Sequence, residues 1–184
     1  MGKSSAHRAA QRRRLPRPAE VSLTEIPELL ERFRRGGELL AAVTTGCAGA
    51  ELDFRPEPTR WSVRQIACHL ADSEQVASVR FRQTIAEDHP TLIRYDEKLW
   101  AERLDYTRRR ISVAVETFRR TRAENYDLLK ALPPESFTRT ATHAELGVQS
   151  LLDLLRTYAE HVENHVVQIR TLRLAYKATR ESRT

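Results

Sequence analysis

The stretch YAEHVENHVVQI, residues 158–169, decides how the rest of the chain is interpreted. It lies inside a helical pattern that we predict to run from about Ser150 to Tyr176. One face of this helix, followed in steps of three and four residues, reads Leu154, Tyr158, His161, His165, Gln168 and Leu172. The adjacent stripe is fully apolar and consists of Leu151, Leu155, Val162, Val166 and Ile169. Two histidines one turn apart therefore border or enter the core of the protein.

Buried imidazoles need polar partners, because an unsatisfied polar group in a core costs free energy. Histidines at i and i+4 lie about 6 Å apart along the helix axis and can direct nitrogens at one metal ion. For this pair alone, two satisfied or solvent-facing histidines are an equally good interpretation. The zinc-protease motif does not apply, because it needs a glutamate directly after the first histidine and Val162 stands there. Glu163 is predicted to point away from the metal face.

A third histidine, His69, lies on the apolar face of a second predicted helix, in WSVRQIACHLADSE, residues 61–74. This helix is expected to begin at Ser62, which forms a capping box with Gln65, and to end near Asp88. Taken alone, His69 fits a core histidine. If the two helices face each other, however, it meets the other two histidines near one level, and a three-histidine metal site becomes the favoured interpretation.

The remaining pattern is helical almost throughout, with no convincing strand. We predict helices at about Thr24–Val43, with Thr24 as its N-cap, at Asp96–Arg103 and at Ser112–Leu132. Four long helices and 184 residues indicate one all-α domain, a four-helix bundle. The first two and the last two long helices are joined by connections short enough for antiparallel neighbours. The long connection between the second and third permits a crossover or a lid.

The formal net charge of +6 comes from the N-terminus, where no acidic residue precedes Glu20 and the basic residues are Lys3, Arg8, Arg12, Arg13, Arg14 and Arg17. We predict a disordered basic tail at 1–19, the bundle domain at 20–178 and a C-terminal tail at 179–184. The tail lacks aromatic residues for base stacking, so a nucleic-acid partner is not expected. Neither a membrane-spanning run nor a secretory signal is predicted, and the two cysteines lack metal or disulfide spacing. We therefore expect a cytoplasmic protein without a membrane partner.

Two of the quoted segments, WSVRQIACHLADSE and YAEHVENHVVQI, resemble signatures of the DinB/YfiT-like superfamily, and YDEKLWAE (residues 95–102) is similar to its middle segment. The likeness spans about Val21 to Tyr176. It implies an up-down-down-up bundle, a homodimer, and a divalent ion, zinc or nickel, held by His69, His161 and His165. Asn164 departs from the family pattern, because many members have another histidine there.

Three imidazole ligands would leave an open coordination position, which is typical of catalytic metal sites. Two uses of a small-molecule substrate stay open: metal-assisted hydrolysis, and transfer of a low-molecular-weight thiol, which relatives of this superfamily catalyse. The alternatives are a bundle with a purely structural metal and a stress-related binding protein. The three histidines do not distinguish these uses.

Other residues are candidates for the surroundings of the site. Arg122 and Tyr158 are expected to bind a substrate or thiol cofactor, although Arg122 fits a pair with a buried acid at least as well. Asp72 and Glu74 are candidates for orienting an imidazole or for a solvated helix face. The segment that contains Asp96 and Trp100 is expected to cover the site, whereas Cys68 is expected to miss the metal.

Overall fold

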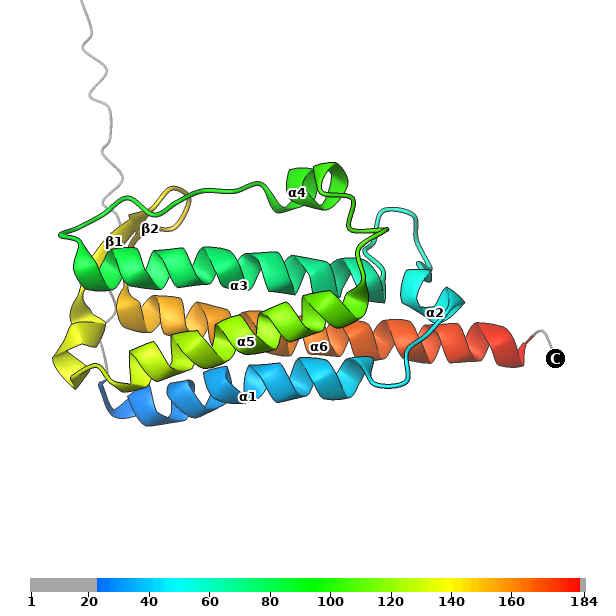
Figure 1. The fold of residues 1–184 in the computed structure, drawn as a ribbon, viewed down its shortest axis with the longest axis horizontal. Coiled ribbons are helices and arrows are strands. Elements are labelled where there is room, and N and C mark those ends of the chain that lie inside the picture. Colours follow the sequence, from blue (N-terminus) through cyan, green and yellow to red (C-terminus); the bar gives the residue numbers. More distant parts are fainter. Residues whose placement is uncertain (1–22, 183–184) are drawn as a thin grey trace, which may run out of the picture.

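Four long helices make up the body of the protein (Figure 1): α1 (Ile26–Thr44), α3 (Val63–Ala86), α5 (Ile111–Lys130) and α6 (Leu151–Glu181). The computed structural model describes residues 23–182, so the basic tail predicted at 1–19 lies outside the described residues. The shorter elements are two 3-10 turns, η1 (Leu23–Glu25) and η2 (Pro134–Thr138), and two short helices, α2 (Ala50–Asp53) and α4 (Glu97–Arg103). The all-α four-helix bundle is confirmed. None of the described helices combines the length and hydropathy that a membrane span requires.

The helices follow an up-down-down-up order, because α1 and α6 point one way and α3 and α5 point the other (Figure 1). Around the bundle, α1 packs against α6, α6 against α3, α3 against α5 and α5 against α1. The expectation that α1 and α3, and likewise α5 and α6, are neighbours is therefore wrong. They are antiparallel but lie across the diagonal. The segment 87–110 runs back along the bundle, so α5 starts at the same end as α3 and packs beside it (Figure 1).

Side-chain caps define where α3 and α6 begin. The Ser62 hydroxyl accepts from the Gln65 N–H while the Gln65 side chain accepts from the Ser62 N–H, the capping box that the sequence predicts. Ser150 and Asp153 form the same motif at the start of α6. The predicted N-cap at Thr24 is wrong, because Thr24 lies within η1 and Glu25 precedes α1 without a capping side chain.

The ends of the elements differ from the prediction in two places. Helix α6 continues to Glu181 rather than ending near Tyr176, so the predicted C-terminal tail at 179–184 begins inside this helix. A two-stranded antiparallel hairpin, β1 (Thr140–His143) and β2 (Gly147–Ser150), occupies a loop in which no strand was expected. Strands of four residues are too short to show a clear alternation, and packing of the buried Ala141 against the bundle holds them.

A buried ion pair joins all four long helices. Arg122 on α5 donates to Glu74 on α3 over 2.6 Å, and it also donates to the backbone carbonyls of Phe33 on α1 and Tyr158 on α6. Its guanidinium lies over the rings of Phe33 and Phe118, 3.9 and 4.7 Å from their centroids. These two rings belong to the two separate apolar clusters of the core. The ion pair therefore sits where the two halves of the core meet.

Two adjacent glycines in α1 give a test of how tightly this region packs. A methyl group at Gly36 would come within 2.8 Å of Val162 Cγ1 and 3.0 Å of Arg122 Nη1, whereas one at Gly37 would make an ordinary 3.6 Å contact with Arg119. Gly37→Ala should raise the free energy of unfolding by about 0.5–1 kcal/mol, because alanine is the better helix former. Gly36→Ala should lower it by about 1–3 kcal/mol through overpacking. Urea unfolding measures both, and equal effects of the two variants would contradict the close approach at Gly36.

Candidate metal centre

Three histidine side chains converge where α3 and α6 face each other. His69 Nε2 lies 3.0 Å from His161 Nε2, and His165 Nε2 lies 3.1 Å from the same atom. All three nitrogens are within 4.8 Å of one another. His69 is buried and the other two are half-buried. His161 and His165 lie one turn apart on the same face of α6, and His69 faces them from α3. These are the three residues that the sequence analysis singled out.

Three neutral imidazoles in this arrangement cannot all form proper hydrogen bonds with one another. His165 Nδ1 lies 2.9 Å from Gln168 Oε1, and because an amide oxygen only accepts, Nδ1 carries the proton and Nε2 is bare. His161 Nε2 then has at most one proton to share between His165 Nε2 and His69 Nε2. Protons alone leave at least one of the three nitrogens without a proper partner. A cation among them would satisfy all three lone pairs.

Burial keeps these side chains neutral. Loss of solvation lowers the pKa of His69 to about 3, and the nearby His165 adds to this effect. Loss of solvation, together with the neighbouring imidazoles and Arg122, lowers the pKa of His161 to about 2. The pKa of His165 is also lowered by burial, although its hydrogen bond with Gln168 acts in the opposite direction. At neutral pH the three imidazoles are unprotonated on at least one nitrogen each, the form in which histidine binds metals.

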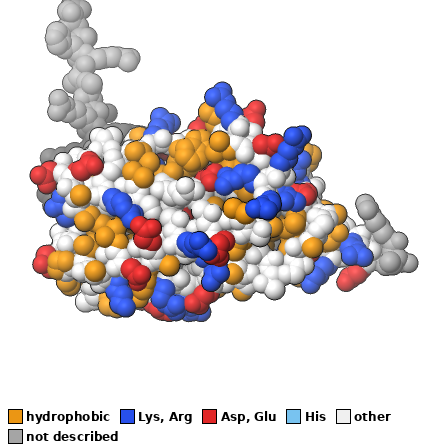
Figure 2. Space-filling view, viewed as in Figure 1, with side chains coloured by type: hydrophobic (Ala, Val, Ile, Leu, Met, Phe, Trp, Pro, Cys, Tyr) orange, Lys and Arg blue, Asp and Glu red, His pale blue; other side chains and the backbone are white. Residues whose placement is uncertain are grey.

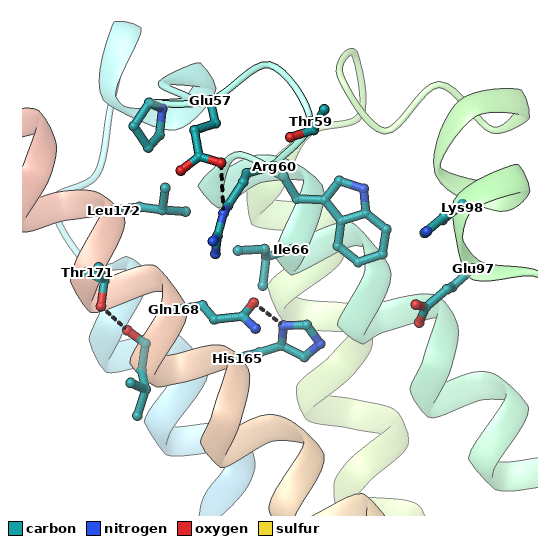
Figure 3. A pocket seen from close by; sticks show the side chains of 13 residues that line it. Glu57, Thr59, Arg60, Ile66, Glu97, Lys98, His165, Gln168, Thr171 and Leu172 are labelled. Carbon is teal, nitrogen blue, oxygen red and sulfur yellow. Dashed lines mark hydrogen bonds and ion pairs between the residues drawn. The ribbon is translucent and has the colours of Figure 1, made fainter.

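A pocket of about 870 Å³ opens beside the triad (Figure 3). Helix α6 contributes His165, Gln168 and Leu172 on one side, and Glu97 and Lys98 of α4 project from the other side. The loop before α3 supplies its remaining wall, which includes Pro56, Glu57, Thr59, Arg60 and Trp61. The Trp61 ring also lies 4.7 Å from the His69 ring. Asp96 and Trp100, which were expected to cover the site, do not line this pocket; Glu97 and Lys98 of the same segment do.

The other predicted residues have different partners. Asp72 accepts from Tyr106 and Arg109, and Glu74 accepts from Arg122 and Asn125, so neither orients an imidazole. The Cys68 thiol faces the Tyr106 carbonyl.

Arg122 forms an ion pair with the buried Glu74, the alternative that the sequence analysis left open. The Tyr158 hydroxyl accepts from Arg80, and its ring centroid lies 6.4 Å from that of His161. Neither residue lines the pocket beside the triad, so binding of a substrate or thiol by Arg122 and Tyr158 stays a prediction.

Glu97 is the neighbour of the triad that the sequence analysis missed. Its Oε2 lies 3.8 Å from His69 Nε2. The spacing could have indicated that Glu97 faces the bundle, because Trp100 and Ala101 follow it at i+3 and i+4 and both pack toward the core. The helix that carries them has only seven residues, too few for a periodic pattern to stand out.

The surface gives no sign of a broad nucleic-acid interface on the face seen in Figure 2. Lysine and arginine side chains are interspersed there with aspartate and glutamate. Histidine is not prominent on this face, in keeping with a triad that lies inside the bundle.

These features define a class of protein: an up-down-down-up four-helix bundle with a histidine triad between its second and fourth long helices. The family model described as the DinB superfamily matches residues 9–169, and the chain belongs to this superfamily. A candidate metal-dependent hydrolase from Oceanobacillus iheyensis is 34% identical over 153 residues, which are 83% of this chain and 88% of that protein. A protein from Bacillus mycoides with the same description is 31% identical over 113 residues, 61% of this chain and 65% of its own length.

Among solved structures, YfiT from Bacillus subtilis superposes with a TM-score of 0.81, covering 88% of this chain and 94% of its own. It is described as a probable metal-dependent hydrolase with an unusual four-helix bundle topology. At 24% sequence identity this likeness shows the fold, and it agrees with the diagonal arrangement of consecutive helices seen here.

Two ion pairs of equal length test how burial sets their contribution to stability. Glu74 with Arg122 and Glu163 with Arg32 both have N–O distances of 2.6 Å, but the first side chains are 1% and 2% exposed and the second 32% and 33%. Glu74→Gln should lower the free energy of unfolding by about 3–5 kcal/mol, because it leaves a buried guanidinium without its counter-charge. Glu163→Gln should lower it by about 1 kcal/mol or less. Chemical denaturation of both variants checks this, and similar losses would refute it.

Proposed function

We propose that His69, His161 and His165 bind one divalent metal ion and that the protein is a metal-dependent hydrolase of a small molecule. The observation that carries this proposal is the convergence of three Nε2 atoms, at contact distances of 3.0 and 3.1 Å, from two different helices. Three ligands arranged around a tetrahedral ion with bonds of about 2.0–2.1 Å lie roughly 3.3 Å apart. The imidazoles therefore need to separate by only a few tenths of an ångström to accommodate the ion.

The donor set favours zinc or nickel. Imidazole nitrogen is a good ligand for both, and three protein ligands leave a position for a substrate or solvent. When bound, such an ion polarises a carbonyl or phosphoryl group and makes a nucleophile available at neutral pH. Among residues 23–182, no aspartate, glutamate or cysteine belongs to the group of ligand atoms within 4.8 Å of one another, so that group consists of imidazoles alone.

The protein's own residues prepare the site for this ion. The Gln168 amide oxygen fixes the tautomer of His165, so its bare Nε2 faces the other two nitrogens. Trp61 packs against His69 and shields it from solvent. The pocket gives a substrate an apolar wall that includes Ile66 and Leu172, together with polar groups from α4 and the loop before α3. This combination suits a small organic molecule with one polar, reactive end.

The descriptions of the Oceanobacillus and Bacillus relatives support hydrolysis over thiol transfer. Transfer of a low-molecular-weight thiol, which the superfamily resemblance left open, would use the same three histidines and is the outcome against which hydrolysis is tested. We also retain as proposals the homodimer and the cytoplasmic location that the sequence indicated.

Metal content of single variants tests the site directly. His69→Ala, His161→Ala and His165→Ala should each lose most of the bound zinc or nickel, because two remaining imidazoles do not enclose an ion. Elemental analysis of the purified proteins after metal loading gives the ion-to-chain ratio, expected near one for the unaltered protein. His143→Ala is the matched control, since His143 accepts from the backbone of its own hairpin turn and lies outside the triad. Full occupancy in His69→Ala would exclude the three-histidine site.

The reaction class is tested with the metal-loaded protein. Cleavage of an activated ester or amide should proceed without any thiol, and it should fall to background after chelation and in His165→Ala. If the protein instead consumes a chlorinated or epoxide electrophile only when a low-molecular-weight thiol is present, the proposal of hydrolysis is wrong. Retention of the helical circular dichroism signal after chelation would show that the ion serves chemistry, whereas melting would indicate a structural ion.

A further inference from the structure

The carboxylate of Glu97 reaches the triad from outside the four-helix bundle. Glu97 Oε2 lies 3.8 Å from His69 Nε2, the nitrogen that faces the other two imidazoles. Within residues 23–182, no lysine or arginine forms an ion pair with Glu97, and His69 is its one partner at ion-pair distance. Glu57, the other acid in this pocket, is by contrast paired with Arg60.

Helix α4 holds this carboxylate in place. Asp96 caps the helix by accepting from the Leu99 N–H over 2.9 Å. Trp100 and the buried Ala101, one turn after Glu97, pack against the core, so Glu97 stands on the face that is turned toward α3. The side chain is 54% exposed because it projects into the open pocket, as Figure 3 shows. It is therefore anchored at its backbone and free to move at its carboxylate.

We propose that Glu97 supplies a fourth, displaceable metal ligand, so that α4 closes the coordination shell in the resting protein and releases it to an incoming small molecule. This inference rests on the proposed metal site. Carboxylate oxygen binds zinc at about 2.0–2.2 Å, and in a tetrahedral shell it lies roughly 3.3 Å from each imidazole nitrogen. The observed 3.8 Å to His69 Nε2 is about half an ångström longer. Glu97 does not belong to the group whose ligand atoms all lie within 4.8 Å of one another, so its half-exposed side chain must rotate toward His161 and His165 to complete the shell.

The exposure of the carboxylate explains why it is displaceable while the histidines are not. His69 is held between α3, Trp61 and the other imidazoles, whereas the Glu97 side chain is 54% exposed and forms no ion pair with a lysine or arginine among residues 23–182. Glu97 and His165 line the same 870 Å³ pocket, so a neutral or anionic group that enters it from solvent has access to the carboxylate as well as to the triad. Exchange of one oxygen ligand for another at this position leaves the three-nitrogen frame unchanged.

The test compares Glu97→Ala with Glu102→Ala in full-length protein. Glu102 lies on the same short helix, five residues on, where it does not line the pocket. Zinc affinity is measured by competition with a chromogenic chelator, and the ligand set is read from the visible spectrum of the cobalt(II) form. Glu97→Ala should weaken zinc binding by about 10–100-fold, the range seen when groups that support a metal site are removed. It should also change the cobalt spectrum, whereas Glu102→Ala should match the unaltered protein in both.

Azide, a small anion that binds open metal positions, gives the second readout. It should bind the cobalt form of Glu97→Ala more tightly than the unaltered protein, because no internal carboxylate competes with it. If Glu97→Ala matches the unaltered protein in zinc affinity, cobalt spectrum and azide binding, Glu97 is an ordinary surface acid and the inference falls while the three-histidine site stands. If the unaltered protein binds neither zinc nor cobalt, the proposed function falls first and this inference with it. Thermal unfolding of both variants establishes that they are folded.

Discussion

The buried pair of Arg122 and Glu74 is the constraint on which the arrangement of the helices depends. Its side chains are 2% and 1% exposed, so both charges are removed from water, a large cost that hydrogen bonds to every polar atom of the pair except Arg122 Nε offset. Those bonds come from Asn125 on α5 and from the carbonyls of Phe33 on α1 and Tyr158 on α6. A shift of any one helix along its axis would leave one of these charged groups unsatisfied. The pair thus sets a single register for four helices whose apolar stripes alone would tolerate several.

That register also sets the height of the histidine triad. An α-helix advances about 1.5 Å per residue, so His69, five residues before Glu74, lies about 7.5 Å along α3 from the ion pair. His161 and His165 follow Tyr158 by three and seven residues, or about 4.5 and 10.5 Å along α6. Because α3 and α6 are antiparallel, these displacements point toward the same end of the bundle. His69 therefore arrives midway between the two histidines of α6, which explains how residues 92 positions apart come into contact.

The helices and the triad could be predicted because their signals are local. Periodicity identifies the faces of α3 and α6, and a serine with an acid or amide three residues later marks their starts. Which helices become neighbours could not be predicted in this way, because loop length limits direction but does not choose between an adjacent and a diagonal position. The role of Arg122 stayed open for the same reason: its partner lies 48 residues away on another helix. Glu97 was missed because a helix of seven residues shows too little periodicity to mark an inward face.

The triad departs from the hydrogen-bonding pattern that most of the core follows. His69 Nδ1 is buried without a hydrogen-bond partner among the described residues, and three imidazole nitrogens crowd together where protons cannot satisfy them all. The same volume filled by leucine would pack without these costs. Among residues 23–182, one other buried side-chain atom lacks a partner, Arg122 Nε, whereas the Glu74 carboxylate and the Asn125 amide nitrogen are hydrogen-bonded. Crowding of three imidazole nitrogens that protons cannot satisfy is a conflict of the kind expected at functional sites, and it is the observation from which a cation is proposed as the missing partner.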